Sequence, residues 1–102
     1  MSTDFQEKVW LACRKIPKGK ITTYKLLAKA INKPKAFRAV GNALNKNPYA
    51  PKVPCHRVIR SDGQAGGFAG GNKKKILLLK KEGVKFAGEK IFEFTEHLFL
   101  SP

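Results

Sequence analysis

The fold is decided by residues 22–45, which read TTYKLLAKAINKPKAFRAVGNALN. Two helices are predicted in this stretch, at 24–31 and 36–45. A threonine directly before the first helix can cap it, because its side-chain oxygen accepts a backbone N–H left over at the helix start. The turn between the helices contains Asn32, which tolerates turn geometry, and Pro34, which takes the residue before it out of the helical region. Helix, short turn and helix form the outline of a helix-turn-helix.

The second predicted helix has two unlike faces. One is apolar, and the other is small and polar around Gly41, a residue that costs a helix about 1 kcal/mol relative to alanine. Such a glycine indicates close approach by another backbone, either a protein element or a nucleic-acid groove; it is also compatible with a tolerated glycine on a solvated face. The apolar face holds Phe37, Val40 and Leu44, and the polar face holds Arg38, Gly41, Asn42 and Asn45.

Upstream of this pair lies another predicted helix. Thr3 and Gln6 have the spacing of a capping box. Apolar residues then recur at steps of four and three, which is typical of a helix that packs on a core. Pro17 and Gly19 end it. Cys13 lies among these apolar neighbours and is interpreted as a core residue.

Downstream, three prolines in residues 47–54 exclude a helix and a central strand and predict a stiff connector. The connector delivers Cys55 and His56, which are followed by a predicted strand at 57–60. Neighbouring side chains in a strand point to opposite faces. These two residues can therefore cooperate only if the backbone bends between them or a water molecule links them.

Cys55 and His56 could also be structural residues without a catalytic role, because a single cysteine is often a small buried apolar residue and not a nucleophile. A zinc site formed by Cys13, Cys55, His56 and His97 lacks the closely spaced ligand pairs of zinc modules, so no metal is expected. The glycine-rich stretch at 64–71 has neither a P-loop ending nor the dinucleotide-binding spacing. It is interpreted as a flexible loop that borders the site.

The last predicted helix is 73–82, with Ile76, Leu77 and Leu79 facing inward. Glu82 lies at its C-terminus, where the helix dipole disfavours an acidic residue. Such a carboxylate either lies in solvent or has a cationic partner such as a histidine. Beyond it, residues 86–102 alternate in part and suggest a strand or hairpin arm, but their role is not readable.

Composition limits the interpretation further. The chain has 102 residues, enough for one domain, and carries a net charge of +14. This charge favours nucleic acid as the partner, although solubility alone would also explain it. No apolar run is long enough to cross a membrane and no secretion signal is visible, so we expect a cytoplasmic protein. The expected fold is mainly α with a small β element: one winged helix-turn-helix-like domain, 1–102, of about four helices.

Taken together in order, these segments resemble the DNA-binding and active-site domain of the O6-alkylguanine-DNA alkyltransferases. The resemblance covers roughly residues 5–83, and it depends on the order of many short matches. They are Phe5-Gln6 with Val9-Trp10, Ile16-Pro17 with Gly19, Thr23-Tyr24 with Leu27-Ala28, Arg38-Ala39-Val40-Gly41, Asn47-Pro48, Pro54-Cys55-His56-Arg57-Val58, Gly70-Gly71 and Glu82-Gly83.

The resemblance implies direct repair of DNA, in which Cys55 takes an alkyl group from guanine O6 and keeps it. His56 would remove the thiol proton through a water, Glu82 would orient His56, and Asn47 would brace the connector. Tyr24 would pack on the flipped base or assist protonation of guanine as it leaves, and Val58, Phe68 and Ala69 would also bind the base. Contacts to the DNA would come from Arg38, which would intercalate, and from Ala39, Gly41, Asn42 and Asn45 in the minor groove.

The implied partner is double-stranded DNA containing O6-alkylguanine, bound by a monomer without a cofactor. Relatives commonly have a further N-terminal domain, which we expect to be absent here, and often a serine where this chain has Ala69. Two other functions remain open. One is a non-enzymatic alkyltransferase-like protein that flags the lesion, although that class usually has tryptophan in place of the cysteine. The other is a winged-helix regulator in which Cys55 is merely buried.

Overall fold

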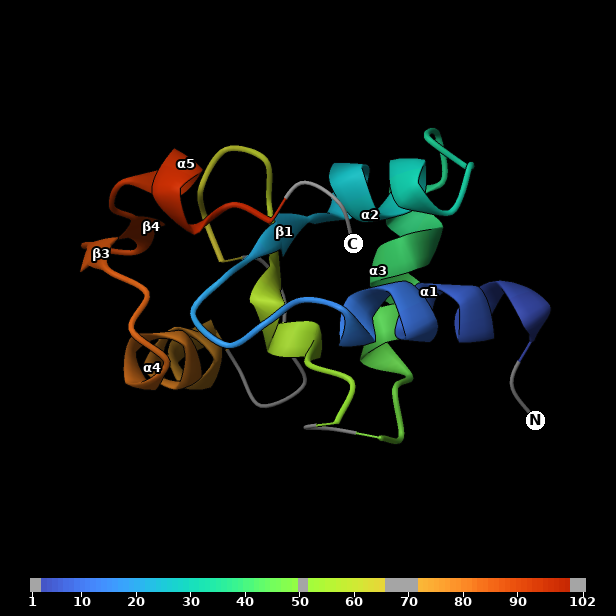
Figure 1. Cartoon of the computed structure of the whole chain (residues 1–102), viewed down its shortest axis with the longest axis horizontal. Coiled ribbons are helices and arrows are strands. Elements are labelled where there is room, and N and C mark those ends of the chain that lie inside the picture. The colour runs from blue at the N-terminus through green and yellow to red at the C-terminus, as the bar shows by residue number, and fades with distance from the viewer. Residues whose placement is uncertain (1–2, 50–51, 66–71, 100–102) are drawn as a thin grey trace.

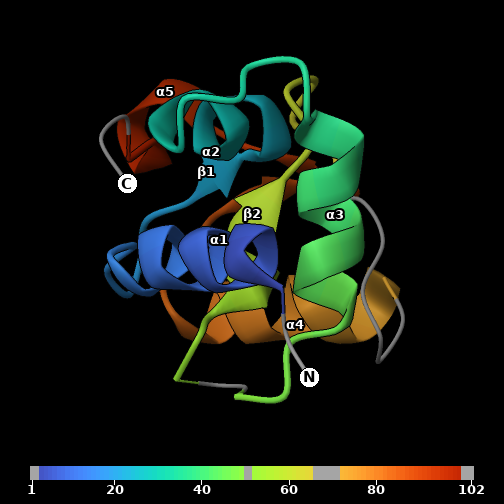
Figure 2. The ribbon, with the colours of Figure 1, turned by 90° about the vertical axis from the view of Figure 1, so that its right-hand side faces the viewer.

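The computed structural model describes residues 3–49, 52–65 and 72–99. Three helices form one half of it: α1 (Asp4–Arg14), α2 (Tyr24–Ala30) and α3 (Phe37–Asn45). The predicted capping box is confirmed, since Thr3 Oγ1 accepts from the Gln6 N–H and Gln6 returns a bond to the Thr3 N–H. Thr23 caps α2 in the same way by accepting from the Leu26 N–H. Figure 2 shows α3 crossing beside both α1 and α2.

A short parallel strand pair lies between this helical half and the rest of the molecule. It joins β1 (Thr22–Thr23) to β2 (Val58–Ile59), with Thr22 opposite Val58. All four residues are buried. The pairing fixes the segment before β2 relative to β1 and the start of α2.

The strand predicted at 57–60 is shorter than expected. Residues Cys55–Arg57 form a 3₁₀ turn, η1, and only Val58 and Ile59 pair as strand. The turn is closed by the bond from the Arg57 N–H to the Pro54 carbonyl oxygen. The local bend that cooperation of Cys55 and His56 requires is therefore supplied by a helical turn of the two residues themselves.

The other half consists of α4 (Asn72–Lys81) and the tail (Figure 1). The tail forms the hairpin β3 (Phe86–Ala87) and β4 (Lys90–Ile91), and then the short helix α5 (Phe94–His97). The predicted hairpin is present. In α4, Leu79 is fully buried as predicted, but Leu77 is 54% exposed and does not face inward.

Two apolar clusters hold these halves together. The larger one is formed by α1, α2, α3 and β2, and includes the fully buried Cys13, so its interpretation as a core residue is confirmed. Within this cluster the Trp10 indole N–H donates to the Ala43 carbonyl oxygen at 2.9 Å, which joins α1 to α3. The smaller cluster packs Ile21, Ile59 and Leu79 against the tail.

The predicted fold class, a mainly helical domain with a small β element, is confirmed, with the short α5 added to the helices expected. Across 3–49, 52–65 and 72–99, no helix combines the length and the apolar character needed to cross a membrane.

Candidate active site

The connector that carries Cys55 is braced from within. The Asn47 side-chain amide donates to the Val53 carbonyl oxygen at 2.9 Å, and its own oxygen accepts from the Tyr49 N–H at 2.8 Å. Tyr49 also stacks edge-on against Trp10, with ring centroids 5.6 Å apart. Asn47 thus closes the loop just ahead of Pro54, and the bulky Tyr49 anchors it to α1.

The two reactive side chains differ in exposure. Cys55 is half-buried, whereas His56 is buried. Because a 3₁₀ helix has three residues per turn, neighbouring side chains diverge by about 120°. The Cys55 sulfur and the His56 ring therefore do not face one another directly, and proton exchange between them calls for a bridging water.

A carboxylate and a guanidinium surround the histidine. Nε2 of His56 lies 3.1 Å from Oε2 of Glu82. This contact is short but not aligned as a hydrogen bond. The aligned bonds of Glu82 come from Arg57, whose Nε and Nη2 donate at 2.9 and 2.6 Å, while Nη1 donates to the Ile16 carbonyl oxygen at 2.8 Å. Of the two alternatives expected for Glu82, solvent or a partner such as a histidine, the structure shows the histidine contact, and it adds the guanidinium of Arg57, which the sequence analysis missed.

Electrostatics make His56 a base and Glu82 an anion. Burial lowers the pKa of His56 below its usual 6.5, against the opposing effect of the Glu82 carboxylate. Burial alone would raise the pKa of Glu82, but the hydrogen bonds from Arg57 and the close contact with His56 outweigh it and bring the pKa below its usual 4.5. A carboxylate at Nε2 favours the tautomer with the proton on that atom, which leaves Nδ1 as the basic nitrogen.

A buried lysine completes the site, and the sequence analysis did not find it. Lys75 of α4 is fully buried, and its Nζ lies 3.2 Å from the Tyr24 hydroxyl oxygen and 5.5 Å from the centre of that ring. It stands in the run Lys73-Lys74-Lys75, which resembles a solvated face. The available signal was the spacing of Lys75, Leu79 and Glu82, at steps of four and three on one side of α4.

The other predicted site residues fall into three groups. On α3, Arg38, Ala39, Asn42 and Asn45 are exposed and Gly41 is half-buried, and a methyl group added at Gly41 would lie 3.8 Å from the Tyr24 ring. Val58 is fully buried and offers no exposed surface to a ligand. Phe68 and Ala69 lie outside the described residues.

Comparison with known proteins places this geometry in a family. The profile described as "6-O-methylguanine DNA methyltransferase, DNA binding domain" matches residues 4–84. The chain belongs to this family. It is 55% identical over 80 residues to the methylated-DNA–protein-cysteine methyltransferase of Methanosarcina barkeri, a match that covers 78% of this chain and 51% of that protein. The chain thus spans about half the length of the methyltransferases it matches.

Two solved structures of proteins in complex with DNA superpose on this chain. A crystal structure of Mycobacterium tuberculosis OGT in complex with DNA superposes with a TM-score of 0.78 at 46% identity, over 80% of this chain and 51% of that one. A crystal structure of S. pombe Atl1 in complex with damaged DNA containing O6-carboxymethylguanine superposes with a TM-score of 0.82 at 30% identity. That match covers 97% of this chain and 98% of Atl1.

Proposed function

We propose that this chain repairs DNA by moving an alkyl group irreversibly from O6-alkylguanine to Cys55, after the base has flipped out of the duplex. The observation that carries the proposal is the arrangement on η1 and at the end of α4. A half-exposed thiol stands beside a buried imidazole of lowered pKa that contacts a carboxylate. Relatives named methylated-DNA–protein-cysteine methyltransferases support it.

In the chemical step, His56 accepts the Cys55 proton through a water at Nδ1, and Glu82 stabilises the imidazolium that results. The thiolate then attacks the alkyl carbon, so that an S–C bond forms and the C–O6 bond breaks with its electron pair left on guanine. Guanine takes up a proton and is restored. Since the thioether is stable, each molecule reacts once, and no cofactor takes part.

Base flipping requires contacts between the protein and the DNA. The target carbon cannot be reached in a stacked duplex, and extrusion costs a few kcal/mol that contacts to the DNA must offset. The polar face of α3 supplies these contacts in the minor groove, with Arg38 filling the space left by the base. Tyr24 lies next to Gly41 of that face and binds the base together with Phe68 and Ala69. The charge of +14 supplies a strong, salt-sensitive attraction to phosphates.

One observation favours a second candidate function. Atl1 matches this chain nearly end to end, whereas the methyltransferases match over about half their length. A protein that recognises the lesion without removing the alkyl group would use the same fold. The two candidates make opposite predictions for the sulfur of Cys55.

The deciding experiment is to incubate the protein with a duplex that holds one O6-methylguanine and to weigh the protein and its peptides. Transfer predicts a mass gain of one methyl group on the Cys55 peptide, none on the buried Cys13, and none in Cys55→Ser. Tight, lesion-selective binding with no mass gain would establish the Atl1-like function. Equal affinity for methylated and unmethylated duplexes with no mass gain would leave only a general DNA binder.

A further inference from the structure

The outer face of α1 carries a large apolar side chain that the core does not use. Leu11 is 60% exposed, whereas its neighbours Trp10 and Ala12 are buried. Because a helix turns by about 100° per residue, Leu11 projects from the side of α1 that faces away from the core. The bond from the Trp10 indole to the Ala43 carbonyl oxygen places α3 on the core side. Leu11 and α3 therefore lie on different sides of α1.

A hollow lies on each side of Leu11, which contributes to the lining of both. The first hollow is about 230 Å³ and lies between α1 and the connector, where Trp10, Tyr49 and Val53 line it. The second is about 280 Å³ and lies between α1 and the end of α2, beside Ile31. Small-molecule pockets are commonly about 300 to 1,000 Å³. Each hollow therefore suits one large side chain better than a whole small molecule.

The rim of these hollows is charged, with an excess of positive charge. Four exposed basic side chains contribute to the linings: Lys8, Arg14, Lys15 and Lys52. Lys8 pairs with Asp4 at 3.7 Å, but within 3–49, 52–65 and 72–99 no ion pair engages the other three. An apolar centre with a polar rim is typical of a protein-binding surface. The excess positive charge makes an acidic partner the complementary one.

Other occupants fit the outer face of α1 less well. A second copy of the chain would bring another net charge of +14 to the contact, and like charges oppose association. DNA presents phosphates, which the carboxylates of Asp4 and Glu7 would repel, since both lie on the same helix face as Leu11. An acidic protein segment with an apolar side chain satisfies both the hollows and the basic rim.

We propose that the outer face of α1, centred on Leu11, is a docking site for an acidic protein segment that inserts a bulky apolar side chain beside Trp10. Because α3 lies on the other side of α1, the segment binds while α3 holds DNA. The partner also touches the connector near the thiol, since the Cys55 N–H donates to the Val53 carbonyl oxygen at 2.9 Å. Docking does not depend on alkyl transfer, so either proposal can fail alone.

The test uses Trp10 as its reporter, because it is the single tryptophan of the chain and lines the first hollow. The whole chain is titrated with a synthetic acidic peptide that forms an amphipathic helix, with glutamate on one face and leucine and phenylalanine on the other. The titration is repeated with saturating unmodified duplex, which occupies α3. The Trp10 fluorescence is expected to change in both titrations with a Kd below about 1 mM. Peptides with serine for the apolar residues, or lysine for glutamate, should leave it unchanged.

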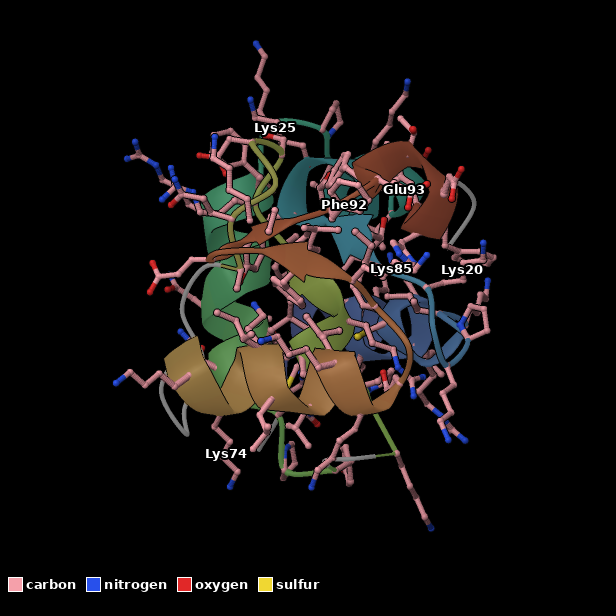
Figure 3. All side chains as sticks on the ribbon, turned by 90° about the vertical axis from the view of Figure 1, so that its left-hand side faces the viewer. Lys20, Lys25, Lys74, Lys85, Phe92 and Glu93 are labelled. Atoms are coloured by element: carbon pink, nitrogen blue, oxygen red, sulfur yellow. The ribbon has the colours of Figure 1, made fainter. Side chains whose placement is uncertain are left out.

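Two pairs of variants locate the contact. Leu11→Ser is expected to weaken peptide binding about 10-fold or more, as for a residue at the centre of an interface. Its matched control is Leu77→Ser, because Leu77 is 54% exposed on α4, at the other end of the molecule (Figure 1). Arg14→Glu is expected to weaken binding and reduce its salt dependence. Lys74→Glu should change binding by less than about twofold, since distant charges are screened; Figure 3 shows Lys74 extending away from α4 into solvent.

An unchanged Trp10 signal at about 1 mM acidic peptide overturns the inference. An equal response to the serine-substituted peptide also overturns it, because charge alone would then account for binding. Loss of the response when duplex is added would show that the peptide had occupied the DNA-binding face. Equal weakening in Leu11→Ser and Leu77→Ser would place the contact elsewhere. A dimer of the free chain in sedimentation that Leu11→Ser dissolves would make a second copy the occupant instead.

Discussion

Replacing Arg57 with methionine should destabilise the fold through the charge it leaves behind. The guanidinium makes two hydrogen bonds to Glu82 and one to the Ile16 carbonyl oxygen, and the paired side chains are only 15% and 13% exposed. Removing one partner of a buried ion pair costs about 3 to 5 kcal/mol. The residual exposure places Arg57→Met at the lower end, about 3 kcal/mol. For a domain of this size that corresponds to a fall in Tm of about 15 °C.

Thermal unfolding followed by circular dichroism measures this loss, and Arg60→Met is the matched control. Arg60 also pairs with a carboxylate, Asp62, at 2.8 Å, but the two side chains are 56% and 43% exposed. Exposed pairs contribute less than about 1 kcal/mol. If Arg57→Met unfolded at the same temperature as Arg60→Met, the pair with Glu82 would contribute nothing to stability.

The stability that Arg57→Met loses should depend on pH, and the direction follows from the pKa of Glu82. Because the pKa of Glu82 is lowered in the folded state, its contribution is present above about pH 4.5 and is lost as the pH falls below that value. In Arg57→Met, much of the lowering of the Glu82 pKa disappears. The Tm difference between wild type and Arg57→Met should therefore shrink on acidification below about pH 4.5. A difference that stayed constant down to strongly acidic pH would mean that charge is not the cause.

Three further substitutions test other parts of the site. Glu82→Gln should leave affinity for an O6-methylguanine duplex intact but slow methyl transfer, by about 10- to 100-fold if the carboxylate stabilises imidazolium; equal single-turnover rates would remove it from the relay. Asn47→Ala loses the bonds to Val53 and Tyr49 and should cost about 1 to 3 kcal/mol in urea unfolding, with slower transfer; unchanged stability would show that the connector needs no brace. Arg38→Ala should keep the Tm but bind the lesion duplex more weakly, and lower the slope of log K against log salt by about one if it contacts a phosphate; unaltered binding and transfer would exclude it from the interface.

The helices were predictable because their signals are local. Thr3 with Gln6, Thr23 before Tyr24, and the turn at Asn32, which adopts a positive φ of 61°, each mark a boundary in a few neighbouring residues. The 3₁₀ turn at Cys55–Arg57 was not predictable in this way. It follows from the parallel pairing of Thr22 with Val58, which joins segments far apart in the sequence.

The site was predictable in part for the same reason. Glu82 is noticeable because it opposes the dipole of its own helix, which leaves two possibilities, exposure to solvent or a cationic partner. That Arg57 is this cation depends on how α4 packs on η1. Lys75 was hidden because its burial comes from Tyr24 and Cys55, while the adjacent lysines give the local pattern of a solvated surface.

The docking of the tail on β1 has a practical consequence for any shortened version of this protein. Backbone bonds from Ile21 to the His97 carbonyl oxygen and from Phe99 to the Ile21 carbonyl oxygen cap one side of the strand. The matched family segment stops at residue 84, before all of these contacts. A fragment trimmed to that boundary would expose both the strand edge at Ile21 and the apolar surface that Phe94 and Leu98 cover. Unprotected strand edges of this kind recruit other chains, so we expect such a fragment to self-associate more readily than the chain with its tail.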